Sequence, residues 1–135
     1  MGCDIHMHAE IKVNGKWEHY DQPDAYRDYA LFEKMAGVRG DVKHAIAPPR
    51  GLPADATTTT KFDCERWDGD GHSHSWLNAE EIAQLREWWD KQGREMRSDT
   101  WDQWLFGNHY SGFIKYPADR VEGLEDVRFI FWFDN

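Results

Sequence analysis

The first thirteen residues alternate strictly between apolar and polar side chains. Apolar residues occupy the odd positions from 5 to 13, and charged residues or histidine occupy the even positions from 4 to 12. A period of two is typical of a β-strand that buries one face. The other face of this strand presents a row of side chains that ligate metals well, namely Asp4, His6, His8 and Glu10. This row constrains both the fold and the site.

Two further stretches supply partners for this strand. Asn14-Gly15 follows it directly, and Asn-Gly between two strand-like runs is a strong hairpin signal, because both residues tolerate positive φ. A return strand over 16–20 follows, in which Trp17 faces inward beside His19 or the reverse, with the register left open. Residues 127–133 form an almost continuous apolar run. Such a run is typical of a central strand covered on both faces, which predicts pairing with the first strand.

Helical periodicity occurs at three places. Asp24 can cap a helix over about 25–36. Asn78 and Glu81 form a capping box before a second helix that reaches about residue 92. A short third helix is predicted over about 98–107. Residues 38–75 show no lasting periodicity, and so long an irregular stretch is usually a functional loop or a disordered one.

These elements predict one α+β domain over residues 1–135. We expect an antiparallel sheet with the N- and C-terminal strands at its centre and two or three helices packed on one face. The long loop over 38–75 is expected to fold across the polar face of the first strand. This packing would bring His72 and His74 close to Asp4, His6 and His8.

Composition limits the classes of partner. The formal net charge of -9 repels a phosphate backbone, so binding to duplex nucleic acid is disfavoured. The chain has two cysteines and no apolar run that resembles a signal peptide or a membrane span. We therefore expect a cytoplasmic protein with free thiols and no membrane partner.

Two His-x-His pairs indicate a metal site. Residues i and i+2 of a strand share a face at roughly 6.5 Å, so neighbouring side chains can hold one ion. Imidazole and carboxylate groups suit a divalent metal, with zinc favoured. The predicted ligands are Asp4, His6, His8, His72 and His74. Glu10 or Asp70 is the predicted general base.

Two resemblances bear on this site. The pattern Asp4-x-His6-x-His8 is similar to the first-strand motif of amidohydrolase and PHP metal-dependent hydrolases, whose histidines hold a metal that activates water. Those families use barrels of about 250 residues, which this chain cannot build, so the likeness is chemical.

The second resemblance spans nearly the whole chain, and its most specific stretches are residues 1–6 and 75–77. They resemble a family of small bacteriophage and prophage proteins, which implies a phage-type cytosolic accessory protein and supplies no catalytic residues.

Other readings of the same residues remain open. Cys3 beside His6 could form a nucleophilic pair, and Asp68-x-Asp70-Gly71 partly matches the start of a calcium loop. A third possibility is a pocket for a small planar ligand, since stacking on tryptophan and guanidinium forks hold such ligands. Its predicted lining is Arg50, Arg66, Trp67 and Trp76.

These observations lead to three alternative functions. The first is metal-dependent hydrolysis of a nucleotide or phosphoester. The second is a non-catalytic binding protein that sequesters a host signalling nucleotide or blocks a host protein. The third is a structural or assembly protein of a virion.

Overall fold

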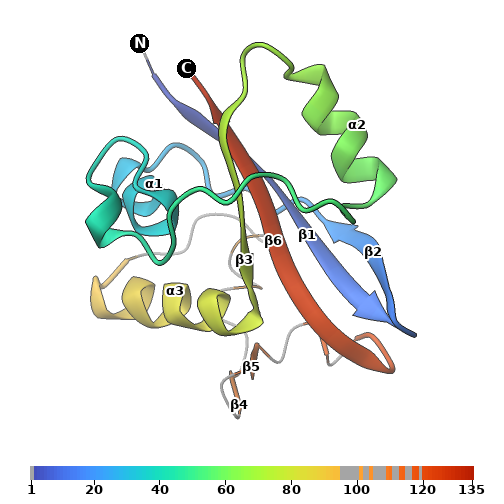
Figure 1. Ribbon diagram of the computed structural model, residues 1–135. Helices are drawn as coiled ribbons and strands as arrows, with labels where there is room; N and C mark the ends of the chain where they lie inside the picture. Colours follow the sequence, from blue (N-terminus) through green and yellow to red (C-terminus); the bar gives the residue numbers. More distant parts are fainter. Residues whose placement is uncertain are drawn as a thin grey trace.

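A four-stranded antiparallel sheet forms the centre of the computed structural model, which describes residues 2–94, 101, 104, 109–110, 113–114, 117–118 and 120–135. The strand order is β2-β1-β6-β3 (Figure 1). The strands are β1 (Asp4–Val13), β2 (Lys16–Asp21), β3 (His72–Asn78) and β6 (Leu124–Asp134). The predicted class and the central place of the N- and C-terminal strands are confirmed.

The remaining elements surround this sheet. Three α-helices are described, α1 (Tyr29–Ala36), α2 (Thr58–Arg66) and α3 (Ala79–Lys91), together with the 3-10 helix η1 (Val42–His44). A separate two-stranded sheet pairs β4 (His109–Tyr110) with β5 (Phe113–Ile114). Among the described residues, no helix has the length and apolar character needed to cross a membrane.

The hairpin between β1 and β2 fixes which side chains share a face. Asn14 and Gly15 both have positive φ, 53° and 76°, as a two-residue hairpin turn requires. Pairing then runs outward from Val13 opposite Lys16 until Glu10 faces His19. Cross-strand partners lie on the same face of a sheet. Trp17 and His19 therefore belong to the polar face of β1.

The apolar face of the sheet makes the core. Met7, Ala9 and Ile11 of β1 pack with the phenylalanines of β6, which are fully buried. The α1 and α3 helices cover this face with Phe32, Leu85 and other apolar side chains. Burial of each such side chain contributes roughly 1.5–3 kcal/mol, so this face supplies most of the hydrophobic stabilisation.

The opposite, polar face is covered by the mid-chain segment. Figure 1 shows the chain before α2 crossing in front of β6, and α2 itself contacts the polar side chains of β1 through Asp63 and Thr60. The predicted crossing of this face is therefore present, but the segment 38–75 is not an irregular loop: it contains η1, α2 and the start of β3. The α2 helix lacks the usual apolar stripe, since Thr60 is its one buried residue and Phe62 is 65% exposed.

The observed ends of the helices can be compared with the capping residues predicted from the sequence. The first helix begins at Tyr29 with Asp28 as its N-cap, later than predicted from Asp24, because the Asp28 carboxylate accepts the backbone N–H of Leu31. The predicted capping box of Asn78 and Glu81 is present at the start of α3. The predicted helix over 98–107 lies largely outside the described residues.

Replacement of Phe131 by alanine is expected to lower the free energy of unfolding by about 3–5 kcal/mol, because the residue is fully buried between β1 and β3. Phe62→Ala is the matched control and should change it by less than about 0.5 kcal/mol. Urea denaturation measures both. Equal losses for the two variants would contradict this description of the core.

Candidate functional site

The polar face of the sheet carries histidine, tryptophan and charged side chains in register. His6 lies opposite Trp132, and Glu10 lies opposite Arg128 on the neighbouring strand β6. Because α2 covers this face, His8 and Glu10 are as buried as the core residues, with exposed fractions of 1% and 0%. The alternation in the sequence therefore reflects two buried faces of β1, one in the apolar core and one beneath the polar contacts of α2.

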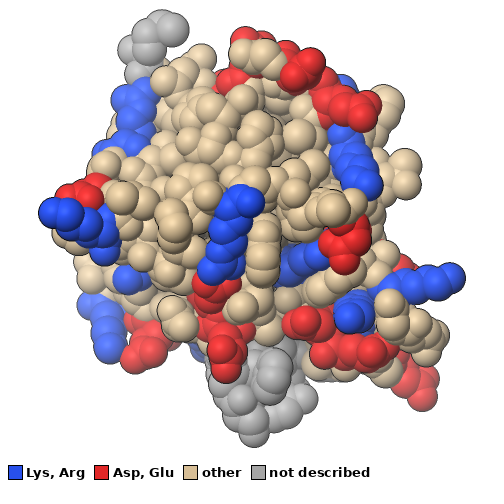
Figure 2. Space-filling model, in the orientation of Figure 1, with Lys and Arg blue, Asp and Glu red and all other residues tan. Residues whose placement is uncertain are grey.

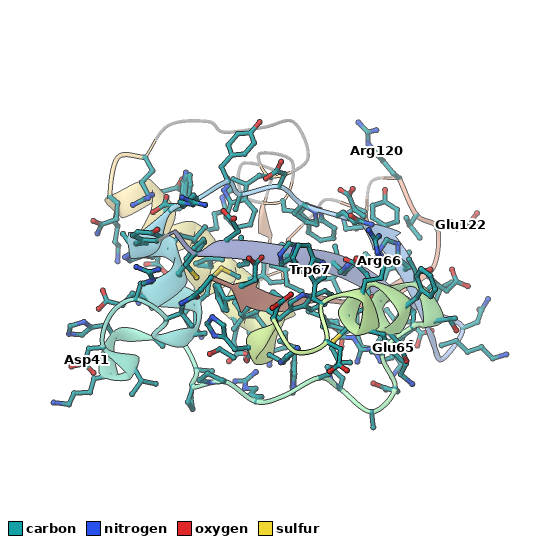
Figure 3. All side chains as sticks on the ribbon, turned by 90° about the horizontal axis from the view of Figure 1, so that it is seen from above. Asp41, Glu65, Arg66, Trp67, Arg120 and Glu122 are labelled. Carbon is teal, nitrogen blue, oxygen red and sulfur yellow. The ribbon has the colours of Figure 1, made fainter. Side chains whose placement is uncertain are left out.

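His6 forms the first imidazole–carboxylate pair. Its Nε2 atom is hydrogen-bonded to the carboxylate of Asp134, which follows Trp132 by two residues on β6. The ring packs against Trp67 at 4.1 Å in a tilted arrangement and stacks against Trp132 at 6.0 Å, both measured between ring centroids. In Figure 3, Trp67 lies at the end of α2 on the side that faces the sheet. The ring of His6 is thus fixed by a carboxylate and two indoles.

His8 forms the second pair and extends it into a chain of three groups. Its Nε2 atom lies 2.7 Å from Oδ2 of Asp63 on α2, and its Nδ1 atom lies 2.9 Å from Nε2 of His19 on β2. Burial lowers the pKa of His19, and the nearby His8 lowers it further. Asp63, His8 and His19 therefore form a continuous hydrogen-bonded path whose last imidazole favours the neutral form.

A polar cavity of about 280 Å³ lies beside these pairs. Both His6 and Asp63 line it, so each of the two imidazole–carboxylate pairs contributes one member. Its other lining residues are Ile5, Met7, Gln22, Pro23 and Asp24. Two carboxylates and no lysine or arginine among these residues make the cavity electronegative. Figure 2 shows that acidic side chains also gather at one end of α2 on this side of the molecule.

Glu10 anchors α2 and does not line the cavity. Its Oε1 atom accepts from Nε and Nη2 of Arg128 at 3.0 and 2.7 Å. Its Oε2 atom accepts from the backbone and hydroxyl of Thr57 and from the hydroxyl of Thr60. Burial raises the pKa of Glu10, but the hydrogen bonds from Thr60, Thr57 and Arg128 outweigh burial and hold it below its usual range. Glu10, predicted as a general base, is thus an anion with both oxygens occupied, and Asp70 lies exposed after α2.

The five predicted metal ligands lie at one end of the sheet without meeting at one point. Asp4 is exposed and paired with Arg27 at 3.0 Å, and His72 is bonded to Asn135 at 2.8 Å. His74 stacks on Trp132 at 6.0 Å from the β3 side, so the indole stands between it and the histidines of β1. Over the described ranges, no three His, Cys, Asp or Glu side chains are close enough to hold one ion.

The indole of Trp132 lies at the centre of a histidine cluster, which consists of His6, His8 and His74. This indole is fully buried and stacks with all three rings. Among the described atoms, its Nε1 finds no hydrogen-bond partner. Burial lowers the pKa of His74, and His72 adds to this effect. The cluster therefore holds His74 in its neutral form near neutral pH.

The other predicted residues are dispersed. Arg50 stacks on Trp76 at 4.5 Å and pairs with Glu81, whereas Arg66 is exposed and 3.7 Å from Asp63. Of the predicted ligand pocket, only Trp67 contacts the histidine cluster. Burial raises the pKa of the Cys3 thiol, which favours an apolar role over a nucleophilic one.

Three residues that bond to one another or to the histidines of β1 were not identified as site residues from the sequence: His19, Asp63 and Asp134. His19 could have been found, because a two-residue Asn-Gly turn sets the register that places it opposite Glu10. Asp134 could have been found from the alternation of β6 after Trp132. Asp63 could not have been identified from the sequence, because α2 has no apolar periodicity that would show which of its side chains face the sheet.

Glu10→Gln is expected to destabilise the fold by about 3–5 kcal/mol, because it removes the buried anion of Arg128 and leaves that guanidinium only the exposed carboxylate of Asp55. Glu18→Gln, at an exposed position of β2, is the control and should cost less than about 0.5 kcal/mol. Urea denaturation of both variants measures the difference. Retention of full stability by Glu10→Gln would show that this anion does not hold the polar face together.

Stability is expected to fall as the pH drops below 6.5. The folded pKa values of His19 and His74 lie below the ordinary 6.5, so the unfolded chain takes up protons first and is favoured through the window beneath that value. The free energy of unfolding at about pH 7.5 and about pH 5.5 measures the loss. His74→Gln should reduce the loss, whereas His44→Gln, at an exposed histidine, should leave it unchanged. If His74→Gln and His44→Gln lost equal stability between these two pH values, the pH dependence would not come from His74.

Comparison with known proteins gives no match. No family model fits the sequence. Neither a curated protein nor a solved structure is similar to it. The function is therefore argued from the geometry of the polar face alone.

Proposed function

We propose that the protein hydrolyses a phosphoester, such as that of a nucleotide, in the cavity beside His6, with a divalent cation as cofactor. One observation carries this proposal. Two imidazoles, two residues apart on β1, are each bonded through Nε2 to an aspartate from another element, and a member of each pair lines the same cavity. Such pairs are typical of acid–base catalysis, in which the carboxylate orients the ring.

His6 is the residue proposed to act on water. It lines the cavity, and Asp134 holds its Nε2 atom, which fixes both the tautomer and the plane of the ring. The indoles of Trp67 and Trp132 pack against the ring and restrict its rotation. A base fixed in this way loses little entropy when it accepts a proton from a water molecule in the cavity.

The charge of the cavity supports a role for a cation. Asp24 and Asp63 would repel a phosphoester that arrived alone. A magnesium or manganese ion keeps most of its water ligands and needs only one or two carboxylates together with the substrate phosphate. These two aspartates can supply them, and the bound ion would offset the negative charge. The oxygen-rich lining favours such hard ions over the zinc predicted from the histidines.

His8 and His19 are proposed to carry a proton away from the cavity. Asp63 lines the cavity, and its Oδ2 atom bonds to His8, which in turn bonds to His19. The lowered pKa of His19, caused by burial and by His8, keeps its imidazole neutral, so this ring would hold a proton only in passing. The path therefore leads from the cavity to β2 at the edge of the sheet.

A phage-type accessory role is compatible with either of two outcomes. The protein either converts a host nucleotide or holds it unchanged, as a sequestering protein would. The two differ in what is recovered after incubation, so one assay distinguishes them.

The test is turnover of nucleotides and of bis(p-nitrophenyl) phosphate by the purified full chain, with magnesium, manganese or zinc added in turn. Product is expected with a divalent cation, and His6→Ala and Asp134→Asn should each lower kcat by about 100-fold or more. His44→Ala is the matched control, because this exposed histidine also pairs with a carboxylate, that of Glu33, and should retain full activity.

Two results would overturn the proposal. One is the absence of product with every cation, and the other is full activity in His6→Ala. Recovery of bound, unaltered nucleotide would favour the sequestering protein instead.

A further inference from the structure

A second cavity, of about 410 Å³, lies on the polar face of the sheet. It is formed where β2, the segment before α2, the end of β3 and the start of β6 meet, and its lining includes Trp17, Trp76, Asp55, Asp126 and Arg128. Val127 of this lining pairs with Ile11, five residues along β1 from His6. Five residues of a strand span about 17 Å, so this cavity is separate from the one beside His6.

Aromatic and apolar groups form the walls of this cavity. Trp17 comes from β2 and Trp76 from β3, and Pro53 and Val127 complete the apolar part. The two indoles already stack with cationic side chains of the protein. The guanidinium carbon of Arg128 lies 3.9 Å from the centroid of Trp17, and that of Arg50 lies 4.5 Å from the centroid of Trp76. Each indole therefore has one face occupied by a guanidinium, and a ligand cation would contact the ring at its opposite face or its edge.

The charge of the lining is negative once its internal pairs are counted. Arg128 is neutralised by Glu10 at 2.7 Å, and its Nη1 atom also donates to Asp55 at 2.8 Å. Asp126 adds a further carboxylate, and Lys12 brings one more cation, 5.9 Å from the ring of Trp17. Arg50, which stacks on Trp76, is paired with Glu81. The four carboxylates of Glu10, Asp55, Glu81 and Asp126 and the three cations of Lys12, Arg50 and Arg128 together leave a net charge of about -1 around this cavity, in a chain whose total is -9.

We propose that this cavity binds a small organic ammonium ion, with its charged head against the indoles of Trp17 and Trp76 and near the carboxylates of Asp55 and Asp126. Aromatic walls joined to carboxylates attract quaternary and protonated amines by two independent effects, the quadrupole of the rings and Coulomb attraction. The same negative charge rejects phosphoesters. The site therefore takes a different class of ligand from the cavity beside His6.

The volume sets the size of the ligand. Pockets for small molecules commonly enclose about 300–1,000 Å³, and this cavity lies near the lower bound. A trimethylammonium or benzylammonium group fits such a volume, whereas an unfolded peptide or a nucleic acid does not. Choline is therefore a suitable probe, and 3,3-dimethylbutan-1-ol is its neutral counterpart of almost the same shape.

Isothermal titration calorimetry of the full chain with each probe tests the proposal. Choline should bind, and the neutral alcohol should bind about tenfold more weakly, because it lacks the charge. Trp76→Leu should weaken the binding of choline by about tenfold as well, and Asp126→Asn should weaken it severalfold. Circular dichroism checks that each variant is folded. Asp126→Asn serves as the second variant if Trp76→Leu does not fold.

His6→Ala separates this proposal from the hydrolytic one, since it should leave the binding of choline unchanged. Equal affinity for choline and the neutral alcohol would overturn the proposal. So would the absence of heat from choline at millimolar concentration, or unchanged binding in both the tryptophan and the aspartate variants. Loss of phosphoester turnover alone would have no bearing on it.

Discussion

The buried carboxylate of Glu10 is the interaction on which the rest of the polar face depends. An anion without solvent costs several kcal/mol unless donors surround it. Arg128 supplies two N–H groups from the neighbouring strand, and Thr57 and Thr60 supply three more donors from the start of α2. The carboxylate also lies at the N-terminus of α2, where the helix dipole favours negative charge. One side chain thus joins two strands and a helix.

This anchor explains why a helix with almost no apolar face docks on the sheet. Thr60 is the one buried residue of α2, and Phe62 points into solvent. The hydrophobic effect therefore contributes little to docking, and polar contacts replace it. Once the first turn of α2 is held by Glu10, its later turns place Asp63 within 2.7 Å of His8 and bring Trp67 to 4.1 Å from His6. The structural anchor and the candidate site are consecutive parts of one surface.

The same reasoning shows what the sequence could predict. Strict alternation in β1 and the apolar run of β6 determined the sheet, because each encodes which face is buried. The capping box of Asn78 and Glu81 determined the start of α3. The α2 helix could not be predicted, because its contacts are hydrogen bonds to distant residues and leave no period in the sequence.

For the histidines, the sequence pattern predicted the face of the strand on which they lie but not the residues that pair with them. His6 and His8 each pair with an aspartate that only the tertiary fold brings near, and Trp132 separates them from His74.

The ion pair of Glu10 and Arg128 also divides the polar face into two chemical environments. On one side lie imidazoles with their carboxylates, which can move protons. On the other side lie two indoles and carboxylates, which can hold charge but have no group suited to proton transfer near neutral pH. Arg128 belongs to both, since its guanidinium binds Glu10 and also stacks on Trp17 at 3.9 Å. Because that guanidinium is shared between the buried carboxylate of Glu10 and that of Asp55, it offsets only part of the negative charge that lines the second cavity.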